Sequence, residues 1–250
     1  MLPVMDPLTA AVAGGMRARL ESLDMLANNI ANSSTTGYKV DREFYSVYAD
    51  AEARAGIDGA VDSVLPLVEK PWTDFTQGTL SPTGRPLDVA LSGKGFFGVT
   101  GPSGALYTRA GNFQLTSTGA VTTQDGYPVR LTDGAALKIA PTQPFEVSDN
   151  GTVTQGGEAL GQLEIVNLPD EGVAKHGASF FRMLDPKARP AQSRDAEVHQ
   201  GKLEGSNVST PETAVRLISV MRQFETLQKA AGIGAEMNRR AIEEVARVGS

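Results

Sequence analysis

Apolar residues near both ends of the chain recur at helical spacing. Near the N-terminus they stand three or four positions apart, at Val12, Met16, Leu20, Leu23, Ala27 and Ile30, and this spacing predicts an amphipathic helix. Asp6 can accept hydrogen bonds from the first free backbone N–H groups of that helix, and Pro7 suits its first turn. The polar cluster at residues 32–37 is expected to end the helix.

The pattern at the C-terminus is more regular. A heptad-like stripe with steps of 3, 4, 3 and 4 runs through Leu217, Val220, Phe224, Leu227 and Ala231. Ser209 or Thr210 is a candidate N-cap, and Pro211 fits the first turn. Gly232 and Gly234 each cost about 1 kcal/mol relative to Ala inside a helix, so we expect a thin, close-packed or bent segment there.

A helix with one apolar stripe needs a surface on which to bury it. Either the two terminal helices pair as a coiled-coil-like domain, or both cover a sheet of one globular domain, and the spacing alone leaves both arrangements open. We predict paired helices at 1–33 and 208–250, a connector at 34–74 and a β domain at 75–207. Residues 47–67 have no strong periodicity, which fits a flexible connector or an exposed helix.

The middle of the chain consists of short alternating runs separated by turn residues. Leu87, Val89 and Leu91 alternate with more polar or smaller neighbours. Turn signals recur at 117–119, 125–126, 133–134 and 150–151. The predicted class is therefore mainly β with α-helical termini (α+β), with a central all-β sandwich or barrel. Its core is expected to contain Phe96, Phe97, Tyr107, Phe113 and Tyr127.

Composition and charge narrow the classes of function. With 29 acidic and 23 basic side chains the net charge is −6, so nucleic acid is not an expected partner. No apolar stretch reaches the roughly 18 to 20 residues that span a bilayer, so direct membrane insertion is not expected. The N-terminus lacks the order of segments found in a signal peptide. The absence of cysteine excludes disulfides, thiolate nucleophiles and cysteine-ligated metals.

The sequence offers little catalytic chemistry. The two histidines, His176 and His199, stand in polar contexts without a second ligand nearby in sequence, as surface histidines do. Gly93 and Gly95 flank a lysine but lack the spacing of a phosphate loop, so they are interpreted as turn residues. A carboxylate pair of the glycosidase kind could come only from Asp88, Asp125 and Asp133, each of which has a structural role available. We predict no catalytic residue, no cofactor and no metal site.

Four sequence blocks carry a more specific signal, and they follow one another at 22–40, 75–99, 107–129 and 201–230. Their marker residues are Asn28, Asn29, Asn32, Gly37, Thr83, Gly84, Pro86, Leu87, Asp88, Gly93, Gly95, Phe96, Phe97, Ser206, Asn207 and Val208. In this order, the blocks together resemble the flagellar rod and hook protein family. The resemblance brackets nearly the whole chain, although residues 140–200 carry no recognisable motif.

Within that family the chain resembles the proximal-rod type. Its 250 residues leave no room for the large extra domains of hook proteins. Residues 221–225 read Met-Arg-Gln-Phe-Glu, where the distal-rod type usually has Gln-Arg-x-Tyr-Glu, and the stretch before Phe75 does not read like that type either. A distal-rod subunit is the nearest alternative.

The resemblance implies a structural subunit of the bacterial flagellar basal-body rod, the shaft that transmits torque for motility, and not an enzyme. Its implied partners are other rod proteins, copies of itself in a helical assembly, and the flagellar type III export apparatus. The implied location is the periplasmic rod, reached without a cleaved signal peptide. The expected assembly interface comprises Val12, Met16, Leu20, Leu23, Ile30, Leu217, Val220, Phe224, Leu227 and Ala231.

Two other classes of protein stay open on the sequence. A cell-wall glycan-cleaving or glycan-binding β protein would need, for cleavage, a cleft with two carboxylates about 5 to 10 Å apart. A soluble β-rich binding module would have ordered, protease-resistant termini and no tendency to polymerise.

Overall fold

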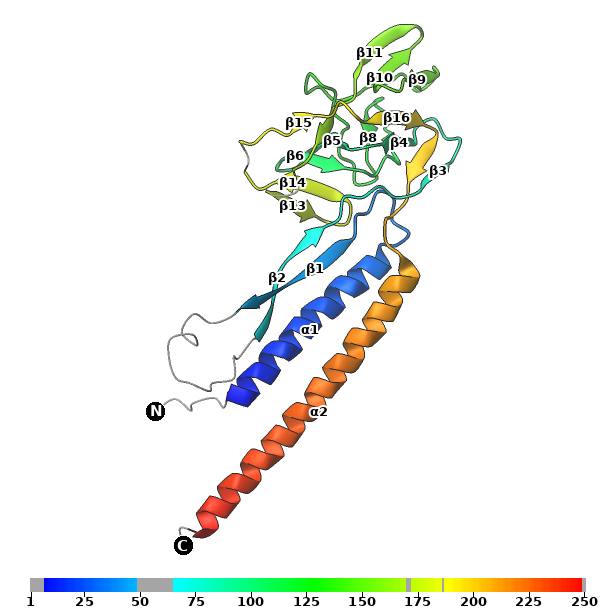
Figure 1. Ribbon diagram of the computed structural model, residues 1–250. Coiled ribbons are helices and arrows are strands. Elements are labelled where there is room, and N and C mark those ends of the chain that lie inside the picture. Colours follow the sequence, from blue (N-terminus) through cyan, green and yellow to red (C-terminus); the bar gives the residue numbers. More distant parts are fainter. Residues whose placement is uncertain (1–6, 49–64, 170–171, 186, 249–250) are drawn as a thin grey trace. The chain divides into compact units, whose positions relative to one another are not determined.

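A computed structural model describes residues 7–48, 65–169, 172–185 and 187–248 (Figure 1). The chain divides into two compact units. The helical unit comprises the described residues of 1–31, 41–72 and 209–250, and the β unit comprises those of 32–40 and 73–208. The N-terminal segment therefore contributes to both units, since the turn after the first helix belongs to the β unit.

Helix α1 spans Pro7–Ala31 and has 25 residues. It begins at the proline that the sequence indicated, while Asp6 lies outside the described residues. It ends where the predicted polar cluster starts, and the backbone N–H of Thr35 then donates to the carbonyl of Asn32 at 3.0 Å. The turn residues therefore stop the helix by satisfying their own backbone groups.

Helix α2 spans Thr210–Val248 and has 39 residues. Ser209 precedes it at the N-cap position and Pro211 lies in its first turn, as the sequence indicated. The helix continues through Gly232 and Gly234. A Cβ added at Gly232 would meet nothing within 4 Å, so the close packing expected at that glycine is not found within the described part of the chain.

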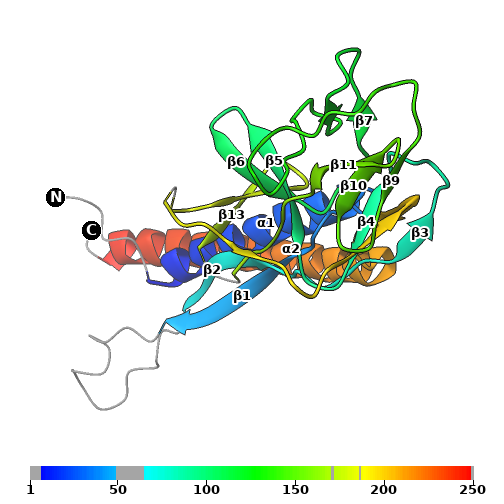
Figure 2. The same cartoon turned by 90° about the horizontal axis from the view of Figure 1, so that it is seen from above.

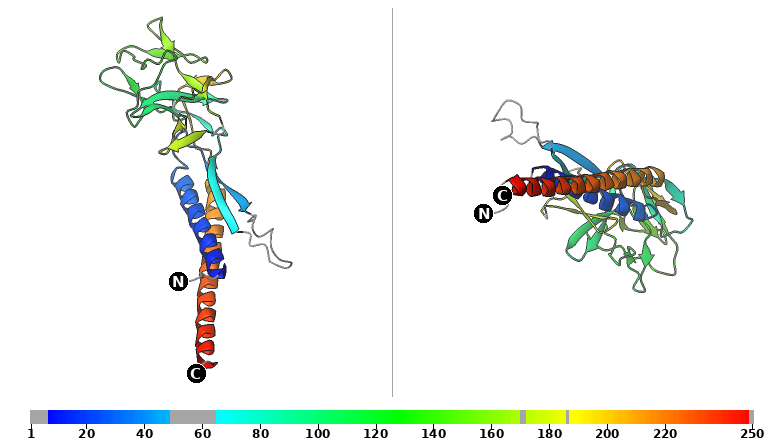
Figure 3. Two further views of the ribbon diagram at one scale, coloured as in Figure 1. Left: turned by 90° about the vertical axis from the view of Figure 1, so that its left-hand side faces the viewer. Right: turned by 90° about the horizontal axis from the view of Figure 1, so that it is seen from below.

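The two helices lie side by side and antiparallel (Figures 1 and 3). A Cβ added at Gly15 would lie 3.5 Å from a methyl carbon of Leu227, which fixes the level at which α1 and α2 meet. At about 1.5 Å per residue, α2 is roughly 20 Å longer than α1. The C-terminal part of α2 therefore continues past the start of α1 (Figure 1).

A two-stranded sheet of β1 (Asp41–Tyr48) and β2 (Leu65–Thr73) completes the helical unit. These strands occupy much of the stretch that was predicted as a connector. Residues 49–64 lie outside the described residues, and with them most of the segment for which the sequence left a flexible link or an exposed helix open.

The largest sheet of the β unit has six strands in the order β13-β14-β6-β5-β12-β15, and every neighbouring pair in it is antiparallel. Figure 2 labels β5, β6 and β13 of this sheet. Their bounds are β5 Phe96–Gly101, β6 Gly104–Thr108, β12 Ile165–Asn167, β13 Val173–His176, β14 Phe180–Met183 and β15 Ala191–Gln192. The motif-poor region at 140–200 thus supplies four of the six strands.

Smaller antiparallel sheets surround this one. They pair β11-β10-β9, β16 with β4, β17 with β3, and β7 with β8. Their bounds are β3 Leu80–Pro82, β4 Val89–Ser92, β7 Gln114–Leu115, β8 Val121–Thr122, β9 Phe145–Val147, β10 Thr152–Gln155, β11 Glu158–Gln162, β16 Glu197–Gln200 and β17 Lys202–Glu204. The glycines at 119, 126, 134 and 151 all have φ between 81° and 87°, which confirms the predicted turns.

The core of the β unit forms on both faces of β5. Phe97 is fully buried in a cluster with Val89, Leu91 and Val99, whereas Phe96 packs in a second cluster with Tyr107, Val166 and Phe181. Neighbouring residues of a strand point to opposite faces, so the paired phenylalanines supply both clusters. The predicted aromatic core is confirmed, with Tyr127 only partly buried. The class is mainly β with a helix at each end, as predicted.

Candidate assembly surface and buried charge cluster

The residues considered for catalysis lie apart in structural roles. His176 is exposed on β13, and His199 is half-buried on β16, where it pairs with Ala90. Asp125 and Asp133 are exposed turn residues, and Asp88 is buried with its carboxylate 3.5 Å from the guanidinium of Arg85. No group of three potential metal ligands occurs among the described residues. In the same part of the chain no helix has the length and apolarity to cross a membrane.

The most concentrated chemistry is a buried charge cluster in the β unit, formed by Lys39, Asp74, Arg109 and Glu204. The ammonium of Lys39 lies 2.7 Å from one carboxylate oxygen of Glu204, and the guanidinium of Arg109 lies 3.0 Å from the other. Backbone N–H of Gly78 also donates to Glu204, at 2.9 Å. The cluster holds two cations and two anions, so its charge is balanced.

Burial controls the ionisation of this cluster. Desolvation lowers the pKa of Lys39, while the neighbouring carboxylate of Glu204 opposes that shift. Burial also lowers the pKa of Arg109, again against Glu204. Arg109 is further held by the carbonyls of Leu91 and Gly93 and stacks over the ring of Phe96. Removal of Glu204 would therefore leave two buried cations without the carboxylate that they share.

Asn207 ties three chain segments together beside that cluster. Its amide oxygen accepts from the backbone N–H of Val40 at 2.8 Å. Its amide nitrogen donates to the carbonyl of Asp74 at 2.8 Å and to that of Thr76 at 3.1 Å. Asn207 thus satisfies backbone groups that no strand pairs, and the family-motif asparagine has a structural role here.

Asn29 has the same kind of role in the helical unit. It is buried on α1, where its amide nitrogen donates to the carbonyl of Asp41 at 2.8 Å and its amide oxygen accepts from the N–H of Asp41 at 3.0 Å. The side chain therefore pairs with the start of β1 as a second strand would. Asn28 is exposed, and Asn32 caps the turn through the hydroxyl of Thr35.

Three motif glycines lie where the structure leaves no room for a side chain. Gly37 has φ of 67°, and a Cβ there would lie 2.3 Å from the backbone nitrogen of Ala110. Gly93 has φ of 85°, and a Cβ there would lie 2.5 Å from the carbonyl of Asp195. Gly95, at the start of β5, leaves no room against Ile165. The interpretation of Gly93 and Gly95 as turn residues is consistent with these contacts.

The motif at 83–88 packs against the turn that joins β16 to β17. The backbone N–H groups of Thr83 and Gly84 both donate to the carbonyl of Gly201, whose own N–H donates to the carbonyl of Asp88 at 2.7 Å. Pro86 accepts from the amide of Gln200. Leu87 packs on the larger core cluster, and Ser206 accepts from the N–H of Val208. These marker residues are therefore structural.

The buried face of α1 differs from the predicted stripe. Within the described chain the buried residues of α1 are Ala18, Ser22, Leu26 and Asn29. The predicted interface residues Val12, Met16, Leu23 and Ile30 are half-buried, and Leu20 is 48% exposed. Small and polar residues let α1 approach its neighbours closely, whereas the larger apolar residues lie to one side. The apolar stripe of α1 is thus only partly used inside the chain.

The predicted stripe of α2 faces α1. Val220 is buried and Leu217, Phe224 and Leu227 are half-buried, whereas Ala231 is exposed. The contact of Leu227 at the level of Gly15 places this face against the other helix. The same stripe therefore has a partner within the chain along most of its length.

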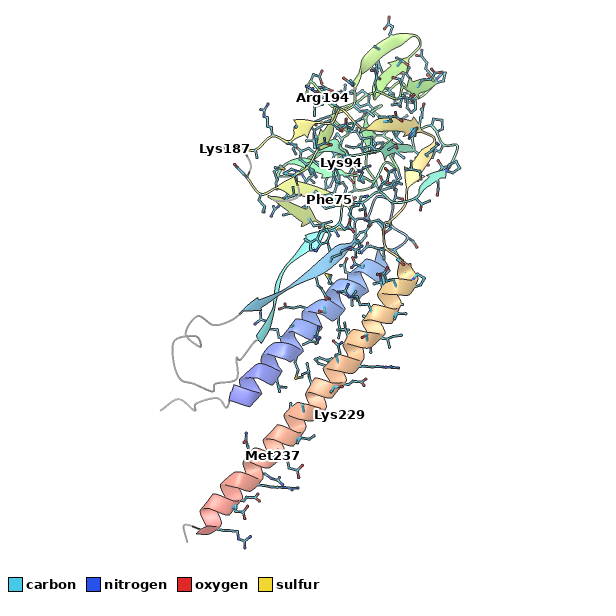
Figure 4. All side chains as sticks on the ribbon, in the orientation of Figure 1. Phe75, Lys94, Lys187, Arg194, Lys229 and Met237 are labelled. Atoms are coloured by element: carbon cyan, nitrogen blue, oxygen red, sulfur yellow. The ribbon has the colours of Figure 1, made fainter. Side chains whose placement is uncertain are left out.

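A second apolar face of α2 was missed by the sequence analysis. It consists of Val215, Ile218, Ile233 and Met237, which are 70%, 52%, 61% and 65% exposed. Val215 and Ile233 each lie nine residues, or two and a half turns, from Phe224, so they stand on the opposite side of the helix. We call this set the outer face of α2. Figure 4 labels Met237, one member of this face.

The N-terminal half of the outer face is also slightly hollowed. The hollow is lined by Val215, Ile218, Ser219, Arg222, Gln223 and Thr226. Apolar side chains that are this exposed on one face of a long helix are a feature of surfaces that bind another protein. The helical spacing of these apolar residues could have indicated this face, but charged residues between them make the pattern hard to recognise in the sequence.

The chain is similar to known proteins over most of its length. Family models match residues 11–39 (flagella basal body rod protein), 90–155 (flagellar hook protein FlgE/F/G D1 domain) and 199–244 (flagellar basal body rod FlgEFG protein C-terminal). The chain is 35% identical to the flagellar basal-body rod protein FlgF of Caulobacter vibrioides, over 90% of this chain and 92% of that protein.

Two further relatives show the same full-length correspondence. The flagellar basal-body rod protein FlgG of Bacillus subtilis is 31% identical over 86% of this chain and 90% of its own length. FlgF of Salmonella typhimurium is 29% identical over 90% and 92%. These relatives match the chain almost end to end, and the three family models match it in order along the sequence. The chain therefore belongs to the flagellar basal-body rod protein family.

Proposed function

We propose that this chain is a structural subunit of the flagellar rod, which assembles with copies of itself and with other axial proteins into the shaft that transmits torque. The observation that carries the proposal is the pair of opposite apolar faces on α2. One face has its partner in α1, and the outer face remains 52–70% exposed at its four apolar residues. An exposed second face on a helix of 39 residues suits contacts between subunits.

The helical unit would form the inner part of such a shaft. We propose that residues 1–33 and 208–250 pair as a coiled-coil-like domain, with 34–74 as the linking region and 75–207 as the outer β domain. The antiparallel contact of α1 with α2 supports this division. The predicted interface at Val12, Met16, Leu20, Leu23, Ile30, Leu217, Val220, Phe224, Leu227 and Ala231 would then be shared between the helix pair and neighbouring subunits.

Within the family we favour the proximal-rod FlgF type over the distal-rod FlgG type. The 35% identity to a FlgF protein exceeds the 31% identity to a FlgG protein, at similar coverage. The Phe at position 224, where the distal-rod type usually has Tyr, points the same way. This assignment would place the subunit in the periplasmic basal body after passage through the flagellar type III export apparatus, without a cleaved signal peptide.

A role in assembly, rather than catalysis, agrees with how the polar residues are used. The buried charges bind one another and backbone carbonyls, and the motif asparagines bind backbone groups. A substitution at either histidine should therefore leave motility intact. His176→Ala and His199→Ala chains with normal rod incorporation but lost motility would contradict the structural role.

The test of the proposed function is to locate the chain in purified basal bodies and to remove its ends. Deletion of residues 1–32 or 208–250 should give a folded β domain that does not support motility. The full-length chain, expressed in the same cells, is the control. A full-length chain that is absent from basal bodies, or a truncated chain that restores swimming, would refute the proposal.

A further inference from the structure

Two rows of three side chains, one on α1 and one on α2, match each other. On α1, Met16, Leu20 and Asp24 follow one another at one-turn intervals, and on α2 the same spacing connects Lys229, Ile233 and Met237. Leu20, Ile233 and Met237 are 48%, 61% and 65% exposed. Each triplet has two apolar residues and one charged residue. The charged residue is the last of the three on α1, Asp24, and the first of the three on α2, Lys229.

Neither charge is used inside the described chain. Asp24 and Lys229 are exposed and belong to no ion pair there, in contrast to Arg17 with Glu21 or Arg240 with Glu236 on the same helices. On α1, Leu20 lies on the opposite side of the helix from the buried Ala18, and Met16 beside it is half-buried. On α2, Ile233 lies on the opposite side from Phe224, which faces α1. A contact between them must therefore come from two different copies of the chain.

The polarity of such a contact follows from the proposed function, on which this inference rests. Copies that repeat by one screw operation along a common axis keep the direction of helices aligned with that axis. Because α1 and α2 are antiparallel within a copy, α1 of one copy meets α2 of the next in the same antiparallel sense. In that sense Met16 faces Met237, Leu20 faces Ile233 and Asp24 faces Lys229, all in one register.

Shifting the two helices by one turn in either direction places Asp24 opposite an unfavourable residue. A shift by one turn in one direction places Asp24 opposite Glu225, where two like charges meet. A shift by one turn in the other direction places Asp24 opposite Ile233, where the carboxylate would lose water without gaining a partner. The matched register alone joins apolar residues to apolar residues and acid to base.

This register places a second copy beside the end of α2 that extends past α1. Since Gly15 lies level with Leu227, the start of α1 at Pro7 lies level with about residue 235, and residues 236–248 continue without α1 beside them. Within one copy, Leu20 lies level with about residue 222 of its own α2. In the contact between copies, Leu20 lies level with Ile233 of the other copy's α2. This stagger of 11 residues, or about 16 Å, lets a second copy cover the exposed end of α2.

We propose that the Met16, Leu20 and Asp24 face of one copy binds the Lys229, Ile233 and Met237 face of the next copy, antiparallel and staggered by about 16 Å. The contact joins two different surfaces, so it leaves one of each free at the ends and extends an open filament. The partner is a second copy of this chain.

Because the chain has no native cysteine, disulfide cross-linking can test this contact directly. One chain carries Leu20→Cys and a second chain carries Ile233→Cys, both full-length and produced together in cells that assemble the rod. A disulfide requires Cα atoms about 4.4–6.8 Å apart. Oxidation should give a dimer only when both chains are present. The control replaces Ile233→Cys by Ser219→Cys, on the same face but about 21 Å along the helix, and should give none.

A charge exchange provides a second measurement. Asp24→Lys in the Leu20→Cys chain, or Lys229→Asp in the Ile233→Cys chain, should lower the cross-linked yield by about two- to fivefold, as for an exposed ion pair. The two changes together should restore it. Both side chains are exposed, so the folding of each copy is preserved.

The outcomes separate this inference from the function on which it rests. Rod incorporation without a cross-link at Leu20 and Ile233, or with an equal cross-link to Ser219→Cys, overturns the proposed contact alone. The same holds if Ile233→Cys links only to a different axial protein. Absence of the unmodified chain from basal bodies overturns both proposals.

Discussion

The substitution Glu204→Gln should destabilise the β unit severely, because it removes the carboxylate that two buried cations share. The side chains of Lys39 and Glu204 are fully buried and that of Arg109 is 2% exposed. Gln keeps the size of Glu and one acceptor for Gly78, but its amide nitrogen is a donor and would face the guanidinium of Arg109. Asp74 is then the only remaining anion of the cluster.

The magnitude follows from the burial of the pair. Breaking a buried ion pair by removing one partner costs about 3–5 kcal/mol, which raises the unfolded fraction by roughly 150- to 5,000-fold at 1.36 kcal/mol per factor of ten. The matched control is Glu164→Gln. Its partner Arg130 lies 2.9 Å away, but the two side chains are 18% and 22% exposed, and burial already raises the pKa of Glu164. That substitution should cost less than Glu204→Gln, because Arg130 keeps access to water and burial already favours the neutral form of Glu164.

The assay must report on the β unit itself. The only tryptophan, Trp72, lies in the helical unit, so its fluorescence does not report unfolding of the β sheets. Hydrogen exchange of β5 amides during urea titration does. A loss below about 1 kcal/mol for Glu204→Gln, equal to that of Glu164→Gln, would refute the reasoning. Recovery in a Lys39→Met, Glu204→Leu, Arg109→Met chain would show that the cost comes from the unpaired cations.

Three further predictions concern the core, the helix pair and pH. Phe97→Ala should cost the β unit about 3–5 kcal/mol in the same titration, and a loss under about 1 kcal/mol would contradict its place in the core. Phe224→Asp should abolish rod incorporation, measured in purified basal bodies, while β5 exchange stays within about 0.5 kcal/mol of the original chain; collapse of the β unit would contradict this. Because burial lowers the pKa of Lys39 below 10.5 in the folded chain, the unfolded chain binds more protons between the two values. Stability should therefore rise with pH up to 10.5 relative to Lys39→Met, and an unchanged difference across that window would exclude the effect.

The elements and the core of the β unit were accessible from local sequence. Pro7 and Pro211 mark the helix starts because proline at the first turn loses no hydrogen bond. The pair Phe96-Phe97 indicates a strand buried on both faces because side chains alternate along it. Signals of this kind depend on near neighbours, so a single sequence contains them.

The charge cluster could not be predicted in the same way. Lys39 and Glu204 are separated by 165 positions, and no local pattern relates a lysine after a tyrosine to a glutamate near the other end. A lysine in a polar motif is normally solvated, so its burial depends on tertiary contacts alone. The hint that the sequence offered was the position of Lys39 between Tyr38 and Val40, two residues with large apolar side chains.

The outer face of α2 was missed for a different reason. The sequence contains two overlapping periodic stripes on that helix, and the heptad stripe through Phe224 is denser than the one through Val215 and Ile233. On α1 the prediction selected the bulky residues, whereas Ala18 and Ser22 form the buried face. Close helix packing favours small residues, which a search for apolar periodicity underweights.

The long separations within the charge cluster determine the order in which the β unit can form. In a chain that emerges from a channel with its N-terminus first, Lys39, Asp74 and Arg109 appear before Glu204, so two cations and one anion wait for the last carboxylate. The strands β16 and β17, which pair with β4 and β3, emerge equally late. In such a chain, native pairing would have to wait until about four-fifths of the residues had emerged, when Glu204 supplies the missing charge.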